Sequence, residues 1–370
     1  MGQSTMMASV DALFNSNYLP ARLLHRDQEL AILSNLFCQE DPSTPPLNVL
    51  VHGSFGIGRT TLLRYFGLHE LTKFRRPFIP FHHKHAHEIV NDTLLTLYSS
   101  SNTSTSIPEK WTLIKRLIRK AETPLVFTLD DVDFQTIEIY GKFLQLCKEN
   151  GVSSMATAPR YFPRQLKSET SRYLDVSLEL EPFSDQQLLD IVRHRVAEIY
   201  PEPVPAEVTE FMADLICMLD FQRPATAVDL LQNLHPLISP TNEITAEKIR
   251  RACLASRTLH YDFWSGHLSN LTDLDATTVL LLQAVGQYFI NHPGQIYVTK
   301  ASLFRQYQQV SEEIGLQPTG SQFSRALNML LFQDLILRSR YMVENYFTLL
   351  PAEGYLEIVE LLLGDYQLEQ

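Results

Sequence analysis

The chain has 370 residues, 45% of them hydrophobic and 20% charged, an ordinary globular composition with room for two or three domains. Its net charge of −11 excludes a protein that coats DNA through a basic surface field, so any DNA contact must come from local patches. Four scattered cysteines and no apolar run of about 18 residues favour a reduced, intracellular protein without a membrane-spanning helix. Residues 1–17 lack a basic stretch followed by an apolar run, so no signal peptide is expected.

The first half of the chain alternates short apolar runs with helical patterns. Strands are predicted at residues 47–52, 76–81, 125–129 and 152–157, and a helix at 60–68. Strands that alternate with helices predict a parallel sheet covered by helices on both faces. Residues 99–106 are rich in Ser, Thr and Asn, and we expect them to form a surface loop.

A glycine-rich segment follows the first strand and opens the helix. It consists of Gly53, Ser54, Phe55, Gly56, Ile57, Gly58, Arg59, Thr60 and Thr61. It matches the phosphate-binding pattern G-x-x-x-x-G-K-[ST] except at the lysine, which is Arg59. Backbone N–H groups and the helix N-terminus would hold phosphates, and Thr60 would place its hydroxyl on Mg²⁺. Arginine keeps the charge but is planar and wider than lysine, so we expect nucleotide binding with weak or absent hydrolysis. The alternative is a glycine-rich turn without a ligand.

An acidic motif follows the strand at residues 125–129. Asp130 and Asp131 stand where P-loop ATPases hold Mg²⁺ and polarise the attacking water. The second position is usually glutamate, and Asp131 is one methylene shorter. A shift of about 1 Å can lower a rate by on the order of 100-fold, so this departure also predicts slow hydrolysis. The alternative is a polar strand terminus without a catalytic role.

The pattern becomes helical after residue 182, which predicts a domain boundary there. Ser184 and Gln187 form a capping box, and apolar residues recur at helical spacing over 188–199, 208–219 and 225–234. A third unit begins near residue 256. Its predicted elements are helices at 275–290, 300–314 and 321–332 and strands at 335–340 and 345–350. Three helices followed by a hairpin predict a winged helix.

The third helix of this unit has one apolar face and one polar face. Gln322, Arg325 and Asn328 lie away from the apolar face, and these residue types read base edges in the major groove. Arg338 and Arg340 are placed on the first hairpin strand, where they would hold phosphates or enter the minor groove. The alternative is a protein-binding winged helix, since the domain as a whole is not basic.

The order of these motifs resembles the AAA+ ATPases of the archaeal and eukaryotic origin-recognition and replication-initiator family. The resemblance covers about residues 14–350 and includes the segments at 18–27, 180–195, 221–231, 298–307 and 323–336 beside the two motifs. It implies an α/β fold with a three-layer P-loop domain, a helical lid and a C-terminal winged helix. The implied domains are an AAA+ base at 14–182, a lid at 183–257, a winged helix at 258–350 and an acidic C-terminal helix at 351–370.

The resemblance also implies roles for single residues. Tyr18, His25 and Arg26 would lie at the nucleotide, the latter two near the adenine. Arg223 would reach the γ-phosphate from the lid, and Arg172 is a candidate arginine finger for a neighbouring subunit. The polar residue expected at the end of the fourth strand is usually Asn, and here only Thr157 is offered.

The implied ligands are ATP or ADP with Mg²⁺, and the implied partner is double-stranded, origin-like DNA. Further implied partners are the replicative helicase and paralogous initiator subunits, with no membrane. The expected location is the cytoplasm, at the nucleoid, or the nucleus in a eukaryote. Two other functions stay open: a diverged signal-transducing P-loop ATPase in transcription or defence, and a non-catalytic scaffold subunit. His82, His83, His85 and His87 could chelate zinc, but a loop without metal is the simpler interpretation.

Overall fold

The structure is a computed structural model that describes residue 14 and residues 18–38, 45–82, 84–98, 106–200, 203–219, 223–238, 244–255 and 274–368. The chain divides into two compact units. Residues 19–183 form one unit, and residues 184–370 form the other together with the segment up to Tyr18. The predicted loop at 99–106 lies almost wholly outside the described residues. No described helix is long and apolar enough to cross a membrane.

A five-stranded parallel sheet forms the centre of the unit 19–183, in the order β2-β3-β4-β1-β5. Its strands are β1 (Asn48–Gly53), β2 (Phe78–Pro80), β3 (Val126–Asp130), β4 (Ser153–Pro159) and β5 (Val176–Leu180). Strand β1, which lies between β4 and β5, is buried along its whole length, as expected of a strand covered on both faces. The predicted α/β fold with its parallel sheet is confirmed, and β5 is an additional edge strand that the sequence pattern did not predict.

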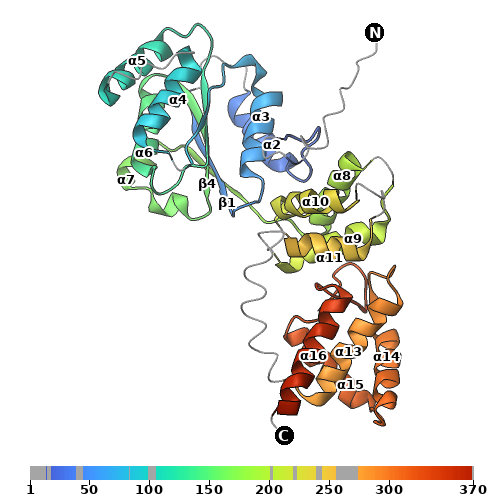
Figure 1. The fold of residues 1–370 in the computed structure, drawn as a ribbon. Helices are drawn as coiled ribbons and strands as arrows, with labels where there is room; N and C mark the ends of the chain where they lie inside the picture. Colours follow the sequence, from blue (N-terminus) through green and yellow to red (C-terminus); the bar gives the residue numbers. More distant parts are fainter. Residues whose placement is uncertain are drawn as a thin grey trace, which may run out of the picture. The chain divides into compact units, whose positions relative to one another are not determined.

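Helices cover both faces of this sheet (Figure 1). One face carries α2 (Asp27–Phe37) and α3 (Arg59–His69), and the other carries α4 (Ala86–Tyr98), α5 (Ile107–Arg119) and α6 (Ile137–Glu149). Two short helices, α7 (Ser168–Ser171) and a 3-10 turn at Phe162–Gln165, connect β4 to β5. Burial of apolar side chains from α4, α5, α6 and the strands forms the larger core of the unit, so the sheet gives a rigid base for the loops at its strand ends.

The second unit begins with four helices and continues into a winged helix. The four helices are α8 (Asp185–Ile199), α9 (Ala206–Leu219), α10 (Pro224–Ile238) and α11 (Ala246–Ala255). The capping box of Ser184 and Gln187 is confirmed at the start of α8. The winged helix contains α13 (Ala276–Asn291), β6 (Val298–Thr299), α14 (Lys300–Glu313), α15 (Gly320–Phe332), β7 (Leu337–Arg338) and β8 (Asn345–Phe347), and α16 (Ala352–Leu368) follows it.

The four helices and the winged helix share one hydrophobic core. Ile296, Tyr297, Leu337 and Phe347 from the winged helix are buried in the same cluster as the apolar faces of α8 to α11. A second cluster joins α13, α14 and α15 to α16. The division after Phe183 lies beside the boundary expected at 182, whereas the expected boundary at 257 falls outside the described residues.

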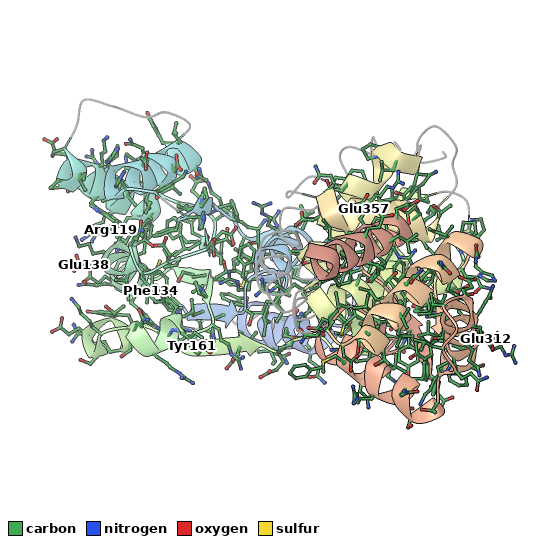
Figure 2. The ribbon with its side chains drawn as sticks, turned by 60° about the horizontal axis from the view of Figure 1, so that its bottom comes forward. Arg119, Phe134, Glu138, Tyr161, Glu312 and Glu357 are labelled. Atoms are coloured by element: carbon green, nitrogen blue, oxygen red, sulfur yellow. The ribbon has the colours of Figure 1, made fainter. Side chains whose placement is uncertain are left out.

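Exposed and buried positions follow the amphipathic patterns. Exposed charged residues such as Arg119 of α5 and Glu357 of α16 are labelled in Figure 2. Three of the four cysteines are buried and none is in a disulfide, as expected, but Cys38 is exposed because it lies just beyond the last turn of α2.

Candidate functional site

The predicted phosphate-binding loop lies between β1 and α3. Gly56 and Gly58 have φ values of 74° and 96°, a left-handed conformation that glycine adopts without steric cost. A Cβ added at Gly58 would meet nothing within 4 Å, so the backbone conformation, and not a lack of space, requires glycine there. The loop runs directly into the first turn of α3, whose N–H groups have no partner within the helix. This is the backbone arrangement that binds phosphate.

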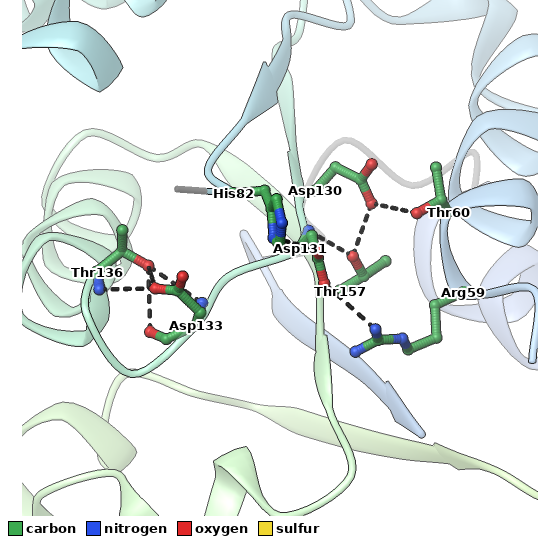
Figure 3. Close-up of polar contacts among 8 residues, drawn as sticks. All are labelled: Arg59, Thr60, His82, Asp130, Asp131, Asp133, Thr136 and Thr157. Atoms are coloured by element: carbon green, nitrogen blue, oxygen red, sulfur yellow. Dashed lines mark hydrogen bonds and ion pairs between the residues drawn. The ribbon is translucent and has the colours of Figure 1, made fainter. Parts of the chain in front are cut away.

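Asp130 ends strand β3 and lies beneath this loop (Figure 3). Its Oδ1 accepts hydrogen bonds from the Thr60 hydroxyl at 2.9 Å and from the Thr157 hydroxyl at 2.8 Å. The two residues assigned to Mg²⁺ therefore lie side by side. Their hydroxyl and carboxylate are hard oxygen ligands, the type that Mg²⁺ prefers, and both of these hydrogen bonds end on Oδ1 of Asp130. Thr60 and Asp130 thus fit an Mg²⁺ ion held together with nucleotide phosphates.

Asp131 adopts an unusual backbone conformation with a φ of 57°, which Asp tolerates better than most residues. Its N–H donates to the Thr157 hydroxyl at 2.7 Å. Its two carboxylate oxygens contact different bases: Oδ1 lies 3.2 Å from Nη2 of Arg59, and Oδ2 lies 2.7 Å from Nδ1 of His82. Both oxygens of Asp131 are therefore occupied within the site (Figure 3).

Arg59 is buried, with 8% of its surface exposed. Burial lowers the pKa of its guanidinium, and the nearby charges of Asp131 and Asp130 oppose this effect. Its Nη1 is buried and has no hydrogen-bond partner among the described residues. A buried charged donor without a partner is unfavourable, and a phosphate oxygen would satisfy it.

Arg26 lies beside the phosphate-binding loop and is hydrogen-bonded to it. Its guanidinium lies 3.9 Å from the centre of the Phe183 ring and donates to the backbone oxygens of Ile57 and Glu181. Burial lowers the pKa of Arg26, and Glu29 opposes the shift. Arg26 thus ties the phosphate-binding loop to the end of β5. Its neighbour His25 has a φ of 56° where the chain turns into α2, and the role of both residues at an adenine stays a prediction.

Three further residues were predicted to act at the nucleotide. In the unit that contains the four helices, Tyr18 donates to Glu198 at 3.0 Å, and Arg223 directly precedes α10. In the sheet unit, Arg172 ends α7 and donates to the hydroxyl of Tyr173 at 3.0 Å. Arg172 is exposed, as a residue that serves a neighbouring subunit must be. The roles of all three stay predictions.

On the winged helix, the predicted base-reading residues all lie on the exposed side of α15. Two of them already have partners. Gln322 accepts hydrogen bonds from Thr319 in the capping box of α15, and Arg325 forms an ion pair with Asp275. The side chain of Asn328 has no hydrogen bond among the described residues. Direct base contact would therefore require Arg325 to exchange Asp275 for DNA.

The hairpin differs from the prediction. The first strand was expected at 335–340, but β7 ends at Arg338 and Arg340 lies in the following turn. The side chain of Arg340 forms an ion pair with Asp185 of α8 at 2.9 Å, and its N–H donates to Asp214 of α9 at 2.7 Å. The strand assignment of Arg340 was wrong because the turn packs against the helices. Arg338 is exposed and has no acidic partner among the described residues.

Two buried charged side chains hold the hairpin and the four helices together. Asp214 accepts hydrogen bonds from the hydroxyls of Tyr297 and Ser339 at 2.9 and 2.5 Å. Arg250 of α11 donates to the backbone oxygens of Ile296 and Thr348. Sequence reasoning missed both residues, because each has partners about 50–125 positions away and no local motif marks them.

His82 was considered only as a metal ligand, and its contact with Asp131 was missed. Its position directly after β2 was the available signal, because the carboxyl ends of neighbouring parallel strands meet at one edge of a sheet. Among the described residues no group of three His, Cys, Asp or Glu side chains could hold a metal ion. His83 lies outside the described residues.

No protein-family model matches the chain. Two curated relatives are the ORC1-type DNA replication proteins 1 of Methanosarcina mazei and Methanosarcina acetivorans, 21% and 20% identical over 258 residues. The alignments cover 64% of this chain and 62% of each relative. The chain therefore spans less than two thirds of the relatives' length.

Solved structures with the same fold cover nearly the whole chain. Cdc6p from Pyrobaculum aerophilum has a TM-score of 0.83 at 19% identity, over 96% of this chain and 98% of that one. The Aeropyrum pernix ORC2 protein in ADPNP–ADP complexes has a TM-score of 0.57 at 15% identity, over 96% and 98%. The ORC1 protein of the same organism in complex with DNA has a TM-score of 0.58 at 17% identity, over 94% and 95%. The resemblance to origin-recognition and Cdc6-type proteins, and the predicted fold class, are confirmed.

Proposed function

We propose that this chain, which shares the fold of the origin-recognition and Cdc6-type proteins, is a diverged replication-initiator-like AAA+ protein. In this proposal it binds ATP or ADP with Mg²⁺, binds origin-like double-stranded DNA, and hydrolyses ATP weakly or not at all. Loading of the replicative helicase beside paralogous subunits, in the cytoplasm at the nucleoid or in a nucleus, is a more distant part of the same proposal.

One observation supports the nucleotide part above all others. The glycine conformations of the loop, the Thr60–Asp130 hydrogen bond beneath it and the unpaired Nη1 of Arg59 lie together at the start of α3. A loop that never binds an anion would gain nothing from a buried guanidinium nitrogen without a protein partner. The Aeropyrum pernix ORC2 protein forms ADPNP–ADP complexes and the ORC1 protein forms a complex with DNA, which supports both ligands for this chain.

In the proposed complex the nucleotide supplies the negative charge that the loop binds, and Mg²⁺ neutralises the phosphates. Thr60 and Asp130 hold the ion. Thr157 keeps Asp130 in place through its hydroxyl, and the N–H groups of the loop orient the phosphates. Asp131 has both oxygens engaged by Arg59 and His82, so it is poorly placed to polarise a water, which supports slow hydrolysis.

The proposal is tested by separate measurements of nucleotide binding and of DNA binding. Calorimetry with Mg-ADP or Mg-ATP should detect binding to the unmodified chain, and Gly58→Val should abolish it because valine resists a φ near 96°. Gly294→Val is the matched control, since Gly294 lies in a surface turn with open space around it. No binding of either nucleotide at millimolar concentration contradicts the proposal.

The DNA part is tested by fluorescence anisotropy with duplexes from mapped chromosomal binding sites and with random duplexes. Arg325→Ala should weaken binding to a preferred site by about 1–3 kcal/mol if Arg325 reads a guanine edge, and much less on random DNA. Sites clustered at a replication origin support the initiator function. Promoter sites would favour a signal-transducing ATPase, and the absence of both ligands would favour a scaffold.

A further inference from the structure

The two residues that depart from the usual nucleotide-binding motifs contact each other. Nη2 of Arg59 and Oδ1 of Asp131 are 3.2 Å apart, although Arg59 begins α3 and Asp131 directly follows β3. Arginine is longer than the usual lysine and aspartate is shorter than the usual glutamate. The longer side chain of Arg59 therefore reaches the shorter side chain of Asp131 (Figure 3).

We propose that Arg59 and Asp131 form a permanent ion pair that stays closed when nucleotide binds. The phosphate then contacts the opposite nitrogen of the same guanidinium, and Asp131 acts as the counter-ion of Arg59. This inference rests on the proposed nucleotide binding and concerns how Arg59 divides its N–H donors between Asp131 and the phosphate. It makes the two departures one coupled feature of the nucleotide-binding site.

One nitrogen of the Arg59 guanidinium can bind a phosphate while the ion pair stays closed. A guanidinium presents five N–H donors in a rigid fork, so one nitrogen can bind a carboxylate while another binds a phosphate. Nη2 of Arg59 faces Asp131, and Nη1 is buried without a partner among the described residues. Phosphate binding therefore completes the hydrogen bonding of Arg59 and does not require the ion pair to open.

The carboxylate is fixed before any ligand arrives. The N–H of Asp131 donates to Thr157, and its Oδ2 lies 2.7 Å from Nδ1 of His82. Thr157 in turn donates to Asp130, so the backbone of Asp131 is tied to the Mg²⁺ ligand. A carboxylate held on both oxygens and through its backbone has no partner to gain by swinging away from Arg59.

A double-mutant cycle distinguishes an Arg59–Asp131 ion pair that stays closed on nucleotide binding from one that opens. The variants are Arg59→Lys, which keeps the charge, Asp131→Asn, and their combination. In the protein without nucleotide, thermal unfolding should show a non-additive effect, because lysine reaches less far than arginine and asparagine carries no charge, so each single change weakens the same pair. For Mg-ADP affinity by calorimetry, the two changes should multiply to within about twofold, because a pair present in both states cancels from the binding difference.

The control pairs Arg59→Lys with Asp133→Asn. Asp133 lies two residues beyond Asp131 but accepts its hydrogen bonds from Thr136, so this combination should be additive in thermal unfolding. Additive unfolding for Arg59 and Asp131 would overturn the ion pair, and affinities that depart from additivity about tenfold or more would show that the pair opens on binding. If the unmodified protein binds no Mg-ADP, the proposed function fails, while the unfolding cycle still reports on the pair itself.

Discussion

Replacing Asp214 by Asn tests how firmly the winged helix is joined to the four helices that precede it. The carboxylate is fully buried and accepts from Tyr297 and Ser339 on Oδ2 and from the N–H of Arg340 on Oδ1. An asparagine oxygen can serve the two hydroxyls, but its NH₂ group then faces the N–H of Arg340. One buried N–H left without an acceptor costs about 1–3 kcal/mol.

A second effect works in the opposite direction. Burial raises the pKa of Asp214, and hydrogen bonds from Ser339, Arg340 and Tyr297 only partly offset the shift. The neutral amide avoids burying a charge, so the net loss should be about 1–2 kcal/mol by the same reasoning. For a unit of about 150–250 residues this lowers Tm by about 2–8 °C.

The raised pKa of Asp214 also makes stability depend on pH. The carboxyl stabilises the fold below its unfolded pKa of 3.8 and loses this contribution as the pH rises through the folded pKa. The Asn variant lacks that dependence.

The assay is calorimetric unfolding of the full chain, combined with hydrogen exchange followed by mass spectrometry. Exchange should rise together in peptides from α9 and from β8, because Asp214 joins them through the hairpin. Glu357→Gln makes the same acid-to-amide change at an exposed position of α16 (Figure 2) and should shift stability by less than about 0.5 kcal/mol. An unchanged Tm for Asp214→Asn, or exchange that rises in α9 alone, would refute the reasoning.

Three further predictions follow from the charged residues. Arg338→Ala should flatten the slope of log DNA affinity against log salt by about 0.9. Arg340→Ala should change stability more than salt dependence, because the guanidinium of Arg340 is already ion-paired with Asp185. Equal slopes for the two variants in an anisotropy salt series would contradict this prediction. Burial alone would raise the pKa of Asp275, but hydrogen bonds from Thr278, Thr277 and Arg325 outweigh it and hold the pKa below its usual value. This carboxylate therefore stabilises the fold above its unfolded pKa of 3.8 and loses its contribution as the pH falls; Asp275→Asn should reduce the acid sensitivity of unfolding. ATP turnover should lie far below the enzyme median of about 10 s⁻¹ and should rise in Arg59→Lys combined with Asp131→Glu; an unmodified protein near the median would contradict the account of these substitutions.

Local patterns predicted most of the sheet and the loop, because they act over short stretches of chain. Strands β1 and β3 are buried along their whole length, and the glycines at 56 and 58 mark the left-handed turns directly. Strand β5 was missed because the predictions rested on continuous apolar runs, whereas apolar and polar residues alternate in the partly exposed edge strand Val176–Leu180. The two-residue strand β6 is too short for any periodicity to reveal.

The contacts of the candidate site were predictable only in part. The two motifs assigned Thr60 and Asp130 to the same Mg²⁺ ion, and the structure places the two side chains in contact. The pairing of Arg59 with Asp131 depends on the lengths of the two side chains, and no sequence pattern encodes the distance between them. The turn at Arg340 was misplaced for a similar reason, because its conformation follows from Asp185 and Asp214, which are 155 and 126 positions away.

The core shared by the four helices and the winged helix determines which truncated fragments of this chain keep their buried contacts. A fragment that ends at residue 257 would lose Tyr297, Leu337 and Phe347 from a cluster that also contains Phe211, and it would expose that apolar surface to water. Loss of DNA binding after such a truncation would report misfolding as readily as a missing DNA contact. A fragment that starts at Ser184 keeps every buried member of the cluster, so the DNA contacts of the winged helix can be measured on it separately from the nucleotide site.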